Sequence, residues 1–396
     1  MNEPIVSVII PTFNRLVYLE RTIDSVIRQT FRDFEIIVID DGSTDETRKV
    51  LEEKYDGQII YQWQENQGEA SARNHGFSIA RGKYIAFLDS DDTWCFTKLS
   101  TQVKALENPL NEGAIGTFSS CWLIDENDLN IQKKPVGRVK IGERVDVNER
   151  CTGPGMISPG SNMLIKRKYI EEVSGYDPSI TRYGEDWDFL IRLCSKGRLI
   201  YIDEPLTNYR IHRDTQQRTT PKVEDLSIFL EDMLKVIQKN ANLLFEGNLT
   251  RFNQVQAGIL EKVGAWCFVR ESWDQGNGYL IRSSGLFRNN NFRSKVASRI
   301  GYCKALILLE ELCSTKLAED YMINNFLPKI VDYWPSFLNQ LPKNKLMGVF
   351  YQTMAFNLDS KEKKTIRKLC LKSIITHPRF LFSPKTIQTL ILGCLK

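Results

Sequence analysis

The sequence predicts an α/β domain over residues 1–215, with a mostly parallel sheet and helices on both faces, followed by a basic α-helical domain over 216–396. Two observations predict this arrangement. Short β-branched runs alternate with helical patterns through the first hundred residues, and helical periodicity with few strand signals continues beyond residue 222. The chain of 396 residues is also longer than one hydrophobic core usually requires.

Four apolar runs are predicted to be the first strands of the sheet. They cover residues 6–10, 35–39, 59–61 and 84–88. Helical spacing between the first two runs, and a helix at 70–80, would supply the crossovers that parallel strands need. Residues 113–220 are less regular, but a helix is predicted from Glu185 and a short strand at 199–202.

The two halves of the chain differ in charge. Residues 1–220 hold 28 basic and 34 acidic side chains, whereas 221–396 hold 25 basic and 15 acidic. Residues 213–222 contain no apolar side chain and are predicted to be a linker. The tail 361–396 carries nine Lys or Arg and one acid among apolar residues, which is typical of a terminal helix packed on its own domain, or of a peripheral contact with an anionic membrane surface.

Composition limits the class of protein. A content of 42% hydrophobic and 26% charged residues is typical of globular domains. Nine cysteines without a C-x-x-C pair favour reduced thiols over a disulfide framework or a zinc site. No signal peptide or membrane-spanning run is visible, so the expected location is cytoplasmic, with attachment at the inner face of the membrane as the alternative. No nucleic-acid partner is expected.

Polar turns follow three of the predicted strands, at 12–15, 40–44 and 89–92. Because ligands of such sheets bind outside the carboxyl ends of the strands, we expect these turns to converge on one crevice. Asp89 and Asp91 would project the same way from an extended chain, which suits Mg²⁺ or Mn²⁺ with phosphate and water as the other ligands. A solvated turn or a helix cap is the alternative.

Two further segments suit a nucleotide. The carboxylates of Asp40 and Asp41 could accept hydrogen bonds from a base or a ribose. Residues 66–74 open a helix, where free backbone N–H groups and Arg73 would favour a phosphate. A capped helix start with a surface arginine is the alternative for that segment.

Four motifs, in this order, resemble the family 2 glycosyltransferases of GT-A fold. They are SVIIPTFNR (7–15), QTFRDFEIIVIDDGSTD (29–45), NQGEASARN (66–74) and LDSDD (88–92). The resemblance spans about residues 5–212 and implies transfer of a sugar from a UDP, GDP or dTDP donor, usually with inversion and with Mg²⁺ or Mn²⁺. The implied acceptor is a glycan or a lipid-linked molecule in polysaccharide or glycolipid biosynthesis.

The resemblance also assigns roles by position. It implies contacts with the nucleotide sugar at Pro11, Thr12, Asn14, Arg15, Asp40, Asp41, Arg73, Asp89 and Ser90. Asp41 matches the residue that reads the base. Asp91 matches the more direct metal ligand, with Asp89 nearer the ribose and Asp92 acting through water, and His212 would complete the metal site or contact the diphosphate.

The acidic segment 184–192 resembles the family element that holds the catalytic base. An inverting transfer needs a carboxylate opposite the leaving diphosphate, to take the proton of the acceptor hydroxyl. Asp186 is the predicted base and Glu185 the second candidate; two acids that complement a helix dipole are the alternative. Ser161, Asn162 and Trp187 are predicted on the acceptor side.

Three other functions are compatible with parts of the sequence. An inactive GT-A-like binding or scaffold protein is disfavoured, because Asp89, Asp91, Asp186 and Arg73 keep their chemical types. A processive synthase would add membrane helices and a Gln-x-x-Arg-Trp segment. A nucleotidyltransferase would usually carry a Gly-rich basic loop after the first strand, where this chain has Pro-Thr-Phe-Asn-Arg.

Overall fold

The computed structural model describes residues 3–131, 135, 160–180, 182–211, 225–286, 315–333, 343–356, 369 and 372. The chain forms two compact units. The first comprises Met1–Pro221 and Glu231–Gly247, and the second Lys222–Leu230 and Asn248–Lys396. The predicted linker, His212 and nearly all of the basic tail lie outside the described residues.

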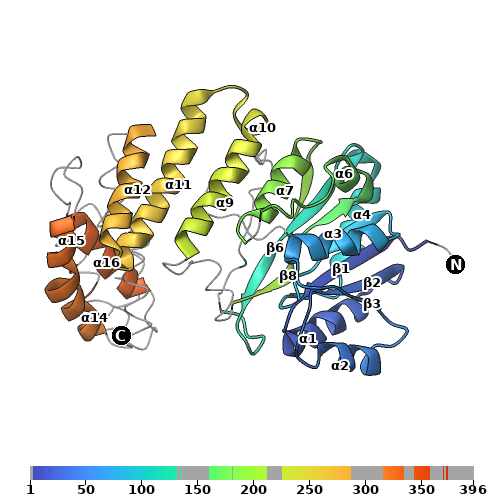
Figure 1. Ribbon diagram of the computed structural model, residues 1–396. Coiled ribbons are helices and arrows are strands. Elements are labelled where there is room, and N and C mark those ends of the chain that lie inside the picture. The colour runs from blue at the N-terminus through green and yellow to red at the C-terminus, as the bar shows by residue number, and fades with distance from the viewer. Residues whose placement is uncertain are drawn as a thin grey trace. The chain divides into compact units, whose positions relative to one another are not determined.

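The first unit is built on a mixed sheet with the strand order β3-β2-β1-β4-β7-β6-β8-β5 (Figure 1). The strands are β1 (Val6–Thr12), β2 (Phe34–Asp40), β3 (Ile60–Trp63), β4 (Tyr84–Phe87), β5 (Thr93–Trp94), β6 (Gly116–Ile124), β7 (Leu164–Lys166) and β8 (Leu199–Arg210). Strands β1 to β4 pair in parallel, as do β6 and β8, whereas β7 and β5 run antiparallel to their neighbours. The prediction of a mostly parallel sheet is confirmed.

Helices cover both faces of this sheet, and α1 and α3 lie on opposite sides of it (Figure 1). The helices of this region are α1 (Leu16–Ile27), α2 (Thr47–Lys54), α3 (Glu69–Ile79), α4 (Lys98–Glu107), α6 (Arg167–Glu172) and α7 (Glu185–Cys194). Val8 belongs to the same buried cluster as Leu19 and Ile23 of α1. The next residue, Ile9, faces α3, where a Cβ on Gly76 would come within 2.4 Å of its Cγ2 atom, so glycine permits this close packing.

Strand β8 is longer than the sequence predicts. It begins at Leu199 as expected, but continues to Arg210 by pairing with β6, with register shifts between Ser119 and Cys121. Polar residues and Pro205 interrupt the apolar pattern in its middle, which is why only its first part is visible in the sequence. The added length carries Tyr209 and Arg210 to the polar edge of the sheet.

The described residues from 225 onward are mostly helical, as predicted. It contains α9 (Leu226–Lys239), α10 (Ala241–Phe245), α11 (Leu249–Val269), α12 (Trp273–Leu286), α14 (Thr315–Tyr321), a π-helical turn (Met322–Phe326), α15 (Leu327–Tyr333) and α16 (Lys343–Phe356). Helices α11 and α12 pack together, and Ser283 donates a hydrogen bond to the carbonyl of Ala257 between them. Among the helices that the structure describes, none is long and apolar enough to cross a bilayer.

Candidate active site

A cavity of about 200 Å³ lies beyond the carboxyl ends of β1 and β4. Its walls come from five separate parts of the first unit: the ends of β1 and β4, the first half of α3, the turn before α7 with the first two residues of that helix, and the end of β8. They include Pro11, Arg15, Glu69, Arg73, Asp89, Ser90, Asp91, Arg182, Tyr183, Gly184, Glu185, Asp186 and Tyr209. The structure therefore brings the predicted Asp-rich strand end and the predicted acidic helix start into one site.

Arg73 lies at the centre of the charged groups in this cavity. Its side chain is 1% exposed, and its guanidinium nitrogens lie 2.8 Å from Asp89, 3.5 Å from Glu69, 3.6 Å from Asp186 and 3.7 Å from Glu185. The sequence predicts that Arg73 contacts phosphate. In the structure, this buried cation lines the cavity and holds carboxylates from three segments together, and its contact with phosphate stays a prediction.

An aromatic platform below Arg73 was not predicted from the sequence. The guanidinium carbon lies 5.1 Å from the centre of the Tyr176 ring, and that ring stacks on Phe189 of α7 at 4.2 Å. The face of an aromatic ring attracts a cation, most strongly where water is excluded. Tyr176 stands in an irregular segment with no motif around it, so only its position in the fold reveals this role.

Burial changes the acidity of two carboxyl groups in the cavity. Burial raises the pKa of Asp89 to about 6, although Arg73 acts in the opposite direction. Burial, reinforced by the negative charge of Asp186, raises the pKa of Glu185 to about 8. Too little water reaches these groups to stabilise several negative charges, so protons are shared among them near neutral pH.

Asp91 and Asp92 are held by two arginines, Arg15 before α1 and Arg210 at the end of β8. Arg15 lies 2.5 Å from the carboxylate of Asp91. Arg210, which is 1% exposed, donates from its Nε to the carbonyl of Asp91 and from its backbone N–H to the carboxylate of Asp92. Tyr18 lies under the Arg210 guanidinium at 5.1 Å. Arg210 therefore sets the shape of the acidic turn, a role that its place in the sequence does not reveal.

The residues predicted to hold the nucleoside lie at the ends of β1 and β2. Asp41 accepts hydrogen bonds from the side chain of Gln64 and the backbone N–H groups of Gln67 and Gly68. Asn14 has a left-handed backbone, with φ of 51°, and its side chain accepts from the N–H of Thr44. These contacts order the loops that border the cavity.

Asp40 and Thr12 are buried beneath these loops. The carboxylate of Asp40 accepts from the hydroxyl of Tyr61 and from the backbone N–H of Ser43. Thr12 is only 3% exposed. Neither residue lines the cavity, whereas the neighbouring Pro11 does.

The residues predicted on the acceptor side lie in the interior. Ser161 accepts a hydrogen bond from the backbone N–H of Asp89, and its carbonyl accepts from the ring N–H of Trp94. The carbonyl of Asn162 accepts from Gln102. Trp187 is 9% exposed, and its ring N–H has no partner among the described residues. Ser161 and Asn162 thus support the Asp-rich turn from behind.

The carboxylates at the end of β4 fit a hard divalent cation in their chemistry, because carboxylate oxygens are the donors that Mg²⁺ and Mn²⁺ prefer. Asp91 faces the cavity, and Asp89 stands beside it. Within the described ranges, no group of three or more His, Cys, Asp or Glu converges as a complete metal site. Phosphate and water are the usual further ligands of such an ion.

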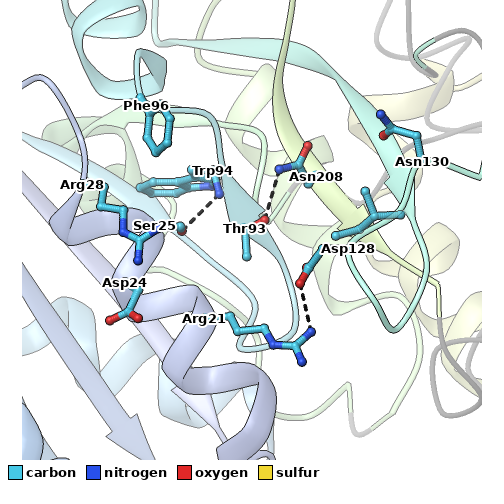
Figure 2. Close-up of a pocket in the computed structure, with 11 residues that line it drawn as sticks. Arg21, Asp24, Ser25, Arg28, Thr93, Trp94, Phe96, Asp128, Asn130 and Asn208 are labelled. Carbon is cyan, nitrogen blue, oxygen red and sulfur yellow. Dashed lines mark hydrogen bonds and ion pairs between the residues drawn. The ribbon is translucent and has the colours of Figure 1, made fainter.

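A second cavity, of about 360 Å³, lies beside the same turn (Figure 2). Thr93 and Trp94, which directly follow the acidic residues, form part of its wall. Figure 2 shows the ion pair between Arg21 and Asp128, and the ring of Phe96 at the border of the cavity. The Arg21–Asp128 distance is 3.0 Å, and Phe96 is exposed. One short segment therefore borders both cavities.

Comparison with known proteins supports the same family. The sequence profile of glycosyl transferase family 2 matches residues 7–174. An uncharacterized glycosyltransferase of Methanocaldococcus jannaschii is 34% identical over 219 residues, which are 53% of this chain and 72% of the relative. The GalNAc(5)-diNAcBac-PP-undecaprenol beta-1,3-glucosyltransferase of Campylobacter jejuni is 33% identical over 217 residues, which are 53% of this chain and 66% of that enzyme.

A solved structure agrees with the fold. S. aureus TarS 1–349, determined in complex with UDP-GlcNAc, matches 81% of this chain and 89% of its own with a TM-score of 0.52 and 20% identity. The likeness supports a GT-A-like sheet and helices. The family profile and the M. jannaschii relative show that the chain belongs to glycosyl transferase family 2.

Proposed function

We propose that this protein transfers a sugar from a nucleotide-diphosphate donor to an acceptor hydroxyl, with inversion at the anomeric carbon. The observation that carries the proposal is the meeting of Asp91, Arg73, Glu185 and Asp186 in one cavity, although they come from distant parts of the chain. A donor-side strand end and a carboxylate able to act as a base are the two parts that such a transfer requires.

The chemistry divides between the two sides of the cavity. Asp186, at the start of α7, would take the proton from the acceptor hydroxyl as that oxygen attacks the anomeric carbon and the bond to the diphosphate breaks. Arg15 lies on the donor side, where its positive charge would face the leaving diphosphate. Arg73 fixes the carboxylates of Asp89 and Asp186 within one cluster, so the two sides keep a constant geometry.

We also propose that the transfer depends on Mg²⁺ or Mn²⁺. Asp91 would be the main protein ligand, with Asp89 beside it, and the donor phosphates and water would complete the set. Such an ion neutralises charge that develops on the leaving diphosphate. Arg15 already pairs with the carboxylate of Asp91. A bound ion would therefore either displace Arg15 or bind the other carboxylate oxygen of Asp91.

The acceptor is proposed to be a lipid-linked or free glycan. This follows from the name of the C. jejuni relative, which acts on a glycan joined through diphosphate to undecaprenol. The uses of Pro11, Asn14 and Asp41 toward the nucleoside, and of His212 toward the metal or the diphosphate, remain proposals from the motifs that carry them.

The test is a screen of the purified chain against UDP-, GDP- and dTDP-sugars with Mn²⁺ or Mg²⁺, measuring nucleotide release and the anomeric configuration of the product. Asp186→Asn should abolish transfer while keeping donor affinity within about threefold. Glu53→Gln, an exposed acid on α2, is the matched control and should behave as wild type. Consumption of no donor by the wild type would contradict the proposal, and an inactive Glu185→Gln beside an active Asp186→Asn would move the base to Glu185.

A further inference from the structure

The turn that leads to the two candidate base carboxylates is held by a helix that lies outside the region matched by the family profile. The profile ends at residue 174, whereas the segment 182–186, a turn and the first two residues of α7, contributes five consecutive residues to the cavity wall. Its backbone begins with the N–H groups of Arg182 and Tyr183. Both donate to the side chain of Asp232 on α9.

Asp232 accepts both hydrogen bonds with a single oxygen. The N–H groups of Arg182 and Tyr183 lie 3.1 Å and 3.0 Å from its Oδ2 atom. The residue is 6% exposed, so water competes poorly for these bonds. Hydrogen bonds from N–H groups to a buried carboxylate are stronger than those between neutral groups.

Two neighbouring contacts hold the same helix against the turn. Gly184 has φ of +90°, a backbone conformation that favours glycine, and it lies against the side chain of Met233 on α9, whose Cε atom would be 2.2 Å from a Cβ at this position. Lower on α7, the buried carboxylate of Asp188 accepts from Asn240 at 2.8 Å and from Lys239 at 3.2 Å. The segment Glu231–Gly247 accordingly belongs to the first compact unit, although it follows residues 213–222 in the chain.

We infer that Asp232 is a positioning residue for sugar transfer, and that Glu231–Gly247 is an integral part of the catalytic unit. Asp232 holds the backbone at 182–183, which sets where the side chains of Glu185 and Asp186 begin. A base displaced by about 1 Å can lose on the order of a hundredfold in rate, so this anchor acts on catalysis without touching substrate. Only the expected effect on the transfer rate rests on the proposed function.

The experiment compares Asp232→Ala with Asp232→Asn and with Glu231→Ala in the full-length chain. Asparagine keeps one carbonyl oxygen that can accept both N–H groups, and Glu231 is the exposed neighbouring acid with the same charge. Two quantities are measured: the rate of amide hydrogen exchange in a peptide covering 178–187, and kcat and KM for the donor.

Asp232→Ala should speed exchange at the turn by about ten- to hundredfold, because the N–H groups of Arg182 and Tyr183 lose the carboxylate that accepts their hydrogen bonds. It should lower kcat by about tenfold or more while KM for the donor stays within about threefold. Asp232→Asn and Glu231→Ala should stay within about threefold of wild type in every quantity. If Asp232→Ala does not fold, Asp232→Ser, whose hydroxyl is too short to reach both amides, replaces it.

Unchanged exchange in the alanine variant would overturn the anchor. Faster exchange with unchanged kcat would overturn the positioning role, as would an equal loss in Glu231→Ala. A wild-type protein that transfers no sugar would refute the proposed function instead, and the exchange measurement would still decide whether Asp232 holds the turn.

Discussion

Replacing Arg73 with glutamine should destabilise the protein strongly, and more so at high pH. Glutamine keeps part of the side-chain volume but removes the positive charge that four carboxylates surround. Because Arg73 is 1% exposed, water cannot take over its role. The variant leaves Asp89, Glu185 and Asp186 close together without a counter-charge.

The size of the effect can be worked out from these contacts. Removing one partner of a buried ion pair costs about 3–5 kcal/mol, because the remaining charge stays buried and uncompensated. The pair with Glu69 adds little, since that side chain is 34% exposed and the distance is 3.5 Å. We therefore expect the free energy of unfolding to fall by about 3–5 kcal/mol at pH 8.5.

The pH dependence has a definite sign. Asp89 and Glu185 have pKa values of about 6 and about 8 in the folded protein, above their ordinary values of 3.8 and 4.5. The folded state therefore binds protons that the unfolded chain has released, and stability falls as pH rises through this range. Without Arg73 both pKa values should rise further, so the loss of stability should shrink toward pH 5, where the carboxyl groups become neutral.

Urea unfolding followed by circular dichroism at pH 5.5, 7.0 and 8.5 measures this loss. Arg48→Gln is the control, because its ion pair with Glu52 lies on the surface at 2.9 Å and should matter little. A loss below about 1 kcal/mol at pH 8.5, or a loss that does not vary with pH, would refute the account of Arg73 as the counter-charge of this cluster.

Three further outcomes are expected from single substitutions. Glu185→Gln should raise stability at pH 8.5 by about 1–3 kcal/mol and flatten its decline above pH 4.5, measured by the same unfolding series; an unchanged pH profile would contradict the raised pKa of Glu185. Burial lowers the pKa of Lys98 to about 7 from 10.5, so the stability of the protein should rise with pH between those values. Lys98→Met should be more stable than wild type at pH 6 but not at pH 10. Equal stabilities at pH 6 would argue against a costly buried charge. Asp91→Asn should lower metal-dependent transfer by about a hundredfold, and near-normal turnover in excess chelator would exclude the metal site.

Part of the site could be predicted because it depends on neighbours in the chain. Apolar runs at 6–10, 35–39 and 84–88 became β1, β2 and β4. Parallel pairing of these strands places Thr12, Asp40 and the acidic residues that follow Phe87 at one edge of the sheet. The acids that follow Gly184 do begin a helix, as their pattern predicted.

Other parts depend on distant contacts that no local pattern records. Strand β6 and the second half of β8 form through pairing with each other, and Arg210 reaches the acidic turn only because β8 continues that far. Asp232 reaches across 49 residues of sequence to hold the backbone N–H of Tyr183.

Arg73 shows most clearly what the sequence and the tertiary structure each determine. The sequence determined that an arginine would open α3 near the carboxyl edge of the sheet, because helix starts and strand ends are local features. It could not determine that this arginine is buried among Glu69, Asp89, Glu185 and Asp186. Periodicity fixes which side of an element a residue occupies, whereas burial and pKa depend on what other segments pack against it, and only the tertiary structure decides that.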